Sequence, residues 1–297
     1  MFIVPVNEDD LKPLFNRILE ILKSLEVFRA TPKFFVVYAW DNRDMPNSLA
    51  DEKVVHEFID WFKIAGCKIR SDKTEAARDV IESQLCLLPY KGHEENSAKF
   101  VVLCGSELLG DYTNSTHFEE YADEMVRTCS SGQSDEERRE AVNKVYNEHF
   151  KLRKQQGRAL HHVETEAALL KIRVKSGEKD SIILVQLNGQ TRRSFPSFLT
   201  ENNAILRTVL GSDRSKCECF LRVLEKLVDY GKHGQGPAHL IQLMIGVYGK
   251  AVEELRHSIH QSLTDSSLDR HIRDSNNACD AWIKSRQNFP TGIELKG

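Results

Sequence analysis

Residues 33–40 read KFFVVYAW, a lysine followed by apolar residues that are mostly aromatic or β-branched. A strand with one solvent-exposed face would alternate apolar and polar residues, and this run does not alternate. It is typical of a strand that is buried on both faces of a parallel sheet. Two later runs, KFVVL at 99–103 and SIILVQL at 181–187, have the same character. Residues 33–40 therefore predict the first strand of a buried parallel sheet.

Helical periodicity fills the intervals between these runs. Apolar residues recur at three- and four-residue steps in 9–28, 52–65 and 160–174, and shorter strands are expected at 67–70 and 205–210. Strands that alternate with helices favour a parallel sheet with right-handed crossovers. We therefore predict the α/β class: a flavodoxin-like, doubly wound parallel sheet of five strands, with added helices.

Three parts are expected along the chain. Residues 1–32 form an N-terminal helix, 33–235 form the α/β domain, and 236–297 form a helical extension that follows a glycine-rich linker. Within the α/β domain, 111–157 is interpreted as an inserted helical hairpin, because two helix starts with capping-box spacing flank the polar link 129–133. No internal repeat is present in the sequence.

Composition argues against several classes of function. The 41 Lys and Arg residues are balanced by 44 Asp and Glu, so the sequence lacks the basic excess that is typical of nucleic-acid binding. No apolar run approaches the roughly 18 residues of a membrane-spanning helix, and the start of the chain does not match a secretory signal. Seven scattered cysteines, an odd number, suggest reduced thiols in the cytoplasm.

Familiar catalytic motifs are missing from the sequence. It contains no glycine-rich phosphate loop of the two common kinds, no GxSxG and no HExxH. Cys217 and Cys219 lack a second pair at zinc-ligand spacing, so we expect no metal site. In a parallel sheet, ligands bind beyond the carboxyl ends of the strands, and this rule selects residues 38–41, 70–72 and 105–108.

Five segments in order along the chain resemble the motifs of TIR domains and of the related SEFIR-type domains. They are FVVYAWD at Phe35–Asp41, GCKIRSD at Gly66–Asp72, FVVLCGSELL at Phe100–Leu109, HHVETEAAL at His161–Leu169, and Ile182–Val185 followed by Ser194-Phe195-Pro196. The resemblance covers residues 33–231 apart from the hairpin at 111–157, and it implies the same flavodoxin-like sheet.

In catalytically active TIR domains, one glutamate on the helix before the fourth strand cleaves NAD+ between ribose and nicotinamide. The resemblance implies that this chain is an NAD+ glycohydrolase that takes NAD+ as its substrate and needs no cofactor. Glu166 matches the family's glutamate because it lies 16 residues before Ile182. Glu120 is the reserve candidate, and Glu164 faces another side of the helix. The residues expected to line the nucleotide cleft are Tyr38, Trp40, Asp41, Arg70, Asp72, Ser106 and His162.

One carboxylate is chemically sufficient for this reaction. Nicotinamide leaves NAD+ as a neutral ring, so no general acid has to protonate it, unlike the leaving group of an ordinary glycoside. The site has to hold the ribose and stabilise an oxocarbenium-like cation, which a carboxylate in a partly dehydrated cleft can do.

The resemblance also suggests partners. TIR-like domains commonly complete their site by self-association, so we expect contact with a second copy, with another TIR-like protein or with a host protein, in immune or stress signalling. The expected location is the cytoplasm, including the cytosol of a host cell into which a bacterial effector is delivered. Two alternatives stay open: a non-enzymatic TIR- or SEFIR-type adaptor, and a sensor that binds a nucleotide without turnover.

Overall fold

Contacts between residues divide the chain into two compact units. The sheet unit comprises 32–62 and 68–210, and the helical unit comprises 1–31, 63–67 and 211–297. The computed structural model describes residues 8–29, 34–39, 48–70, 87–88, 98–129, 134–156, 162–187, 193–200, 205–207, 216–228, 236–258 and 262–287.

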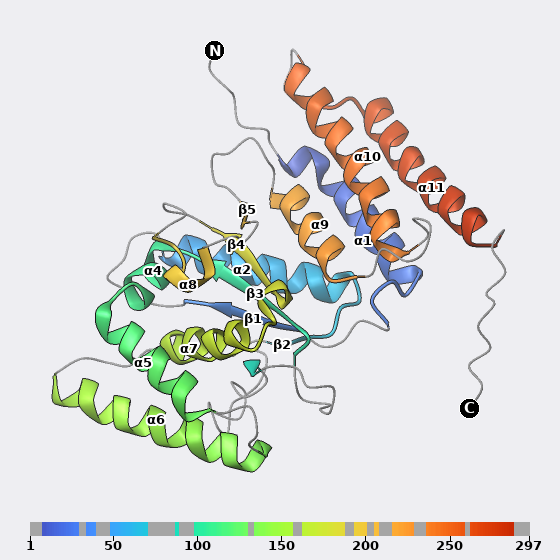
Figure 1. Cartoon of the computed structure of the whole chain (residues 1–297). Helices are drawn as coiled ribbons and strands as arrows, with labels where there is room; N and C mark the ends of the chain where they lie inside the picture. The colour runs from blue at the N-terminus through green and yellow to red at the C-terminus, as the bar shows by residue number, and fades with distance from the viewer. Residues whose placement is uncertain are drawn as a thin grey trace, which may run out of the picture. The chain divides into compact units, whose positions relative to one another are not determined.

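Parallel strands form the sheet of the first unit (Figure 1). They are β1 (Phe34–Tyr38), β2 (Ile69–Arg70), β3 (Phe100–Gly105), β4 (Ile182–Gln186) and β5 (Ile205–Arg207). Hydrogen bonds join the strands in the order β2-β1-β3-β4-β5. In the central pairs, Val37 lies opposite Leu103, and Leu103 lies opposite Leu184.

The predicted fold class is wrong for the chain as a whole. The described structure is 74% helical and 9% strand, so it is not a doubly wound α/β protein. The strands β1, β3 and β4 have five or six residues and form the body of the sheet, whereas the edge strands β2 and β5 have two and three. A central strand is buried on both faces, so its sequence is a long apolar run that can be recognised. The apolar runs of the two edge strands are short, and the sequence therefore did not indicate that these strands have only two and three residues.

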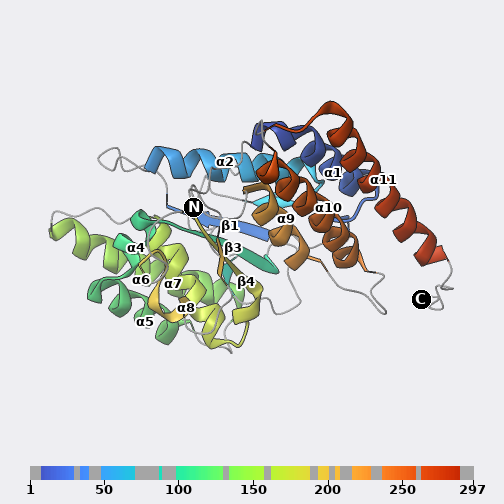
Figure 2. The ribbon, with the colours of Figure 1, turned by 90° about the horizontal axis from the view of Figure 1, so that it is seen from above.

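Helices cover the two faces of the sheet unequally. In the sheet unit they are α2 (Ser48–Ile64), α4 (Glu107–Thr113), α5 (Thr116–Thr128), α6 (Asp135–Gln155), α7 (His162–Lys175), α8 (Ser197–Thr200) and the 3₁₀ turn η3 (Lys179–Ser181). Figure 2 shows α2 on one side of the strands and α5 and α7 on the other. Phe34 packs edge-to-face on Phe62 of α2, with ring centroids 4.8 Å apart.

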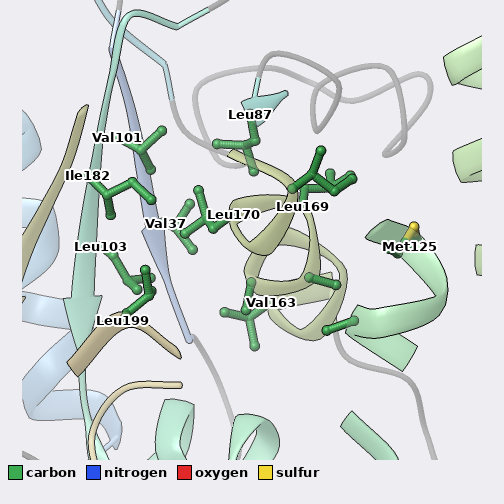
Figure 3. Packing of buried hydrophobic residues seen from close by; sticks show 14 of the residues in the cluster. Val37, Leu87, Val101, Leu103, Met125, Val163, Leu169, Leu170, Ile182 and Leu199 are labelled. Carbon is green, nitrogen blue, oxygen red and sulfur yellow. The ribbon is translucent and has the colours of Figure 1, made fainter. Parts of the chain in front are cut away.

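The main core of the sheet unit lies between the strands and α7. Alternate residues of β1, Phe35 and Val37, belong to this core because successive strand residues point to opposite faces. Leu170 of α7 lies beside Val37, and Leu103 and Ile182 line the same side of the sheet (Figure 3). All five side chains are buried, so this layer provides much of the hydrophobic stabilisation of the unit.

The helices expected within 111–157 are α5 and α6. Ser115 caps α5, and Ser134 forms the expected capping box with Glu137 at the start of α6. The first of these helices, α5, packs along α7, and its Phe118 and Met125 belong to the core of the sheet unit. The hairpin is therefore part of the packed structure, because α5 supplies a second layer over α7.

Four helices make up most of the helical unit. They are α1 (Lys12–Ser24), α9 (Lys216–Lys226), α10 (Pro237–His257) and α11 (Asp265–Gln287), preceded by the 3₁₀ turn η1 (Glu8–Leu11). Phe15 of α1 contacts Phe220 of α9 and Tyr248 of α10 edge-to-face, at centroid distances of 6.0 and 6.1 Å. The expected boundary at 235 separated α9 from α10, whereas contacts group α9 with α1, α10 and α11. No helix in the described ranges is both long and apolar enough to cross a membrane.

Candidate functional site

The two acidic residues near the start of α7 are both buried, in different surroundings. Glu164 is 2% exposed, and its carboxylate accepts a hydrogen bond from Nη2 of Arg153 at 2.6 Å. Glu166 is 1% exposed. Residues two apart on a helix point in directions about 200° apart, so Glu166 does not share the pair with Arg153.

Glu166 lies toward the carboxyl edge of the sheet. The C-terminal end of α7 leads through η3 into Ile182, the first residue of β4, so this end of the helix lies at the amino edge of the sheet. The N-terminal end of α7 lies toward α4, and the two helices are in contact. Helix α4 begins directly after β3 ends at Gly105, at the carboxyl edge of the sheet. Glu166 lies in the second turn from the N-terminal end of α7. It is therefore at the edge where parallel sheets bind ligands.

Tyr38 ends β1 at the same edge and points to the other face of the sheet. Its hydroxyl lies 3.5 Å from Nε2 of His56 on α2, and the two rings meet edge-to-face at 6.2 Å. Glu166 is on α7, which covers the opposite face (Figure 2). The expected arrangement, with Tyr38 beside Glu166 in one cleft, does not occur, because strand alternation sends Val37 and not Tyr38 toward α7.

Ser106 has a structural role at this edge. Its Oγ accepts the backbone N–H of Leu109 at 3.1 Å and caps α4, and only 2% of the residue is exposed. The ring of Phe195 covers Gly105, where an added Cβ would lie 2.3 Å from the ring. A ligand would reach Ser106 only if this packing moved.

The other residues of the expected cleft contribute less to the site. His162 begins α7 and is half-buried, one helical turn before Glu166. Arg70 ends β2, and its side chain lies outside the described part of the structure. Trp40, Asp41 and Asp72 also lie outside the described residues.

A cavity of about 210 Å³ opens between α5 and α6, at a place that sequence reasoning did not select. It is lined by His117, Glu120, Tyr121, Glu124, Val145, Glu148, His149, Leu152, Arg153 and Gln156. Glu120, the reserve carboxylate, is therefore at a cavity, whereas Glu166 is not among the lining residues. The spacing of Val145, His149 and Leu152 on one helical stripe is the signal by which the sequence could have indicated this wall.

The floor of this cavity is built from stacked rings and a buried ion pair. Tyr121 and His149 stack nearly parallel with centroids 4.0 Å apart, and the Tyr121 hydroxyl lies 3.0 Å from Oγ1 of Thr165. Burial, together with the positive charge of Arg153, lowers the pKa of His149 to about 4. Burial also raises the pKa of Tyr121. At neutral pH both rings are therefore uncharged.

Among the residues that the structure describes, no group of three or more His, Cys, Asp or Glu side chains is placed to hold a metal ion. No family model, curated protein or solved structure matches this chain. The described structure offers two places for chemistry, a buried carboxylate on α7 and a mixed polar and apolar cavity on α5 and α6.

Proposed function

We propose that this chain hydrolyses NAD+ at the bond between nicotinamide and ribose, with Glu166 as the catalytic carboxylate. The burial of Glu166, 1% exposed near the carboxyl edge of the sheet, is the observation that supports the proposal. Fully buried carboxylates are uncommon in folded proteins, because removal from water disfavours the charged form unless the group is paired. The resemblance of the sequence to TIR motifs supplies the reaction.

The reaction needs only one charged side chain. The bond between C1′ of the ribose and the nicotinamide nitrogen breaks, and its electron pair goes to the nitrogen, which neutralises the pyridinium ring. Water then adds its oxygen to C1′ and releases a proton, so the products are nicotinamide, ADP-ribose and H+. A carboxylate shielded from water opposes the positive charge that develops on the ribose. Glu166 has this chemical character, and self-association is part of the proposal.

The test compares NAD+ turnover in the full chain with turnover in Glu166→Gln and Glu120→Gln. We expect Glu166→Gln to lower kcat by about 10²–10³, the scale for loss of one electrostatic stabiliser, and Glu120→Gln to leave it within about twofold. Nicotinamide release, followed by chromatography over a range of protein concentrations, measures the rate and shows whether activity rises with self-association. A melting curve for each variant checks folding.

Two outcomes contradict the proposal. One is a folded Glu166→Gln variant that turns over NAD+ as fast as the wild type. The other is a wild-type chain that releases no nicotinamide at any protein concentration, which would favour the non-enzymatic adaptor.

A further inference from the structure

The cavity between α5 and α6 has the walls of a small-molecule site and is suited in size to a small ligand. Its volume of about 210 Å³ has room for a one- or two-ring compound. Val145 and Leu152 contribute apolar walls, and Tyr121 contributes a ring. All of the lining residues belong to the sheet unit. Apolar walls with a few polar groups are typical of sites for small organic ligands.

Two nitrogens at this cavity need hydrogen-bond partners. Arg153 is 7% exposed, and its Nε–H has no partner in the described ranges, although its Nη2 binds Glu164. Nε2 of His149 is also buried and unpartnered there. Buried polar groups are almost always hydrogen-bonded in folded proteins, because an unmade bond is costly. A ligand that carries an acceptor atom would satisfy the guanidinium.

The mouth of the cavity is acidic, whereas its interior offers hydrogen-bond donors. Glu120, Glu124 and Glu148 line it, and their carboxylates can only accept hydrogen bonds when ionised. Arg127 pairs with Glu124 at 2.6 Å and His117 lies 3.8 Å from Glu120, whereas Arg153 is paired with Glu164 and His149 is neutral at pH 7. Acidic groups therefore outnumber the positive charges at this cavity. The mouth therefore favours groups that donate hydrogen bonds and disfavours phosphate, which would meet several negative charges.

We propose that this cavity binds a planar nitrogen heterocycle of the nucleobase kind, with a ring acceptor toward Arg153 and an amino group toward the carboxylates. The apolar walls contact the ring, and the carboxylates select the base or nucleoside over its phosphorylated form. The site is separate from Glu166, which does not line it.

Calorimetric titration of the full chain with adenosine, AMP and agmatine tests the proposal. We expect saturable binding of adenosine and about tenfold weaker binding of AMP. Leu152→Trp, at the cavity, should weaken adenosine binding about tenfold by filling the mouth. Phe150→Trp is the matched control, because Phe150 is a similarly exposed apolar residue of α6 that does not line the cavity, and it should bind as the wild type does. Glu148→Gln should reduce the difference in affinity between adenosine and AMP, because it removes one negative charge from the mouth.

Several results would overturn the proposal. They are the absence of adenosine binding, binding that Leu152→Trp leaves unchanged, AMP binding tighter than adenosine, and binding of the organic cation agmatine in place of adenosine. Glu166→Gln should bind adenosine normally even if it is inactive toward NAD+, so the failure of one proposal is distinguishable from the failure of the other.

Discussion

At the scale of single residues, Glu164 and His149 show two different ways of accommodating a buried ionisable group. Glu164 is neutralised by Arg153 at 2.6 Å, and both side chains are almost fully buried. His149 is instead kept neutral, because its position in the hairpin lowers its pKa to about 4. Both solutions avoid an isolated charge in a dry environment, which would destabilise the fold.

The pKa of His149 predicts a specific acid sensitivity. The folded-state pKa of about 4 lies below the usual value of 6.5, so the unfolded chain binds the proton first. The stability contributed by the neutral ring is complete above pH 6.5 and is lost as the pH falls toward 4. His149→Phe keeps the stack with Tyr121 and removes the proton site, so its urea midpoint should fall less than the wild-type midpoint between pH 7 and pH 5.

The control for this measurement is His257→Phe, because His257 is highly exposed at the end of α10. It should show the wild-type dependence on pH. Equal pH dependence of the urea midpoint in His149→Phe and the wild type would show that protonation of His149 does not reduce the stability of the fold.

At the scale of elements, a carboxylate connects the last two long helices. Glu254 of α10 accepts hydrogen bonds from Ser267 and Arg270 of α11, and lies 2.8 Å from Nε2 of His271. The hydrogen bond from Ser267, followed by those from His271 and Arg270, lowers the pKa of Glu254 to about 2. This network gives the polar helix α11 a fixed partner that its mostly polar sequence did not reveal.

We expect Glu254→Gln to destabilise the helical unit by about 1–2 kcal/mol, a value reduced for the partial exposure of the carboxylate. Because the folded-state pKa is depressed, the contribution is present above pH 4.5 and is lost as the pH falls toward 2. Thermal melts at pH 7 and pH 3 measure it, and the difference between wild type and variant should shrink at pH 3. Glu253→Gln, which loses only surface ion pairs with Arg256 and His257, should change stability little. A Glu253→Gln effect as large as that of Glu254→Gln would contradict this role for the network.

At the scale of the whole molecule, the chain forms two compact units from discontinuous stretches of sequence. The first unit depends on the layer of α7 against the sheet, where Leu170 lies beside Val37 (Figure 3). The second brings α1 together with α9 and α10 through Phe15 and its aromatic neighbours, and α11 packs against α10 and α1. Each unit therefore has buried apolar contacts of its own, which favours separate cooperative opening.

Leu170→Ala tests this division. Leu170 is fully buried, so its truncation should cost about 2–5 kcal/mol. Hydrogen exchange should show the loss of protection in β1, β3, β4 and α7, while α10 and α11 keep theirs. Ile64→Ala, at an exposed residue that ends α2, should change protection little. Uniform loss across both units would mean that they open together.

The sequence by itself determined the central strands and the helices that surround them. Long apolar runs identified β1, β3 and β4, and the spacing of Ser134 and Glu137 identified the start of α6, because burial and capping are local demands on residue type. It also selected Glu166 of α7 as the candidate carboxylate, and that selection stays a prediction.

Only the tertiary structure decided which residues meet. It set Tyr38 on the face opposite α7, built α5 into the core, and opened a cavity at Glu120 and His149. It also reduced the edge strands and made the chain mostly helical. The physical reason is that a side chain's neighbours depend on how elements pack across long sequence separations, whereas a residue pattern reports only the period and burial of its own segment.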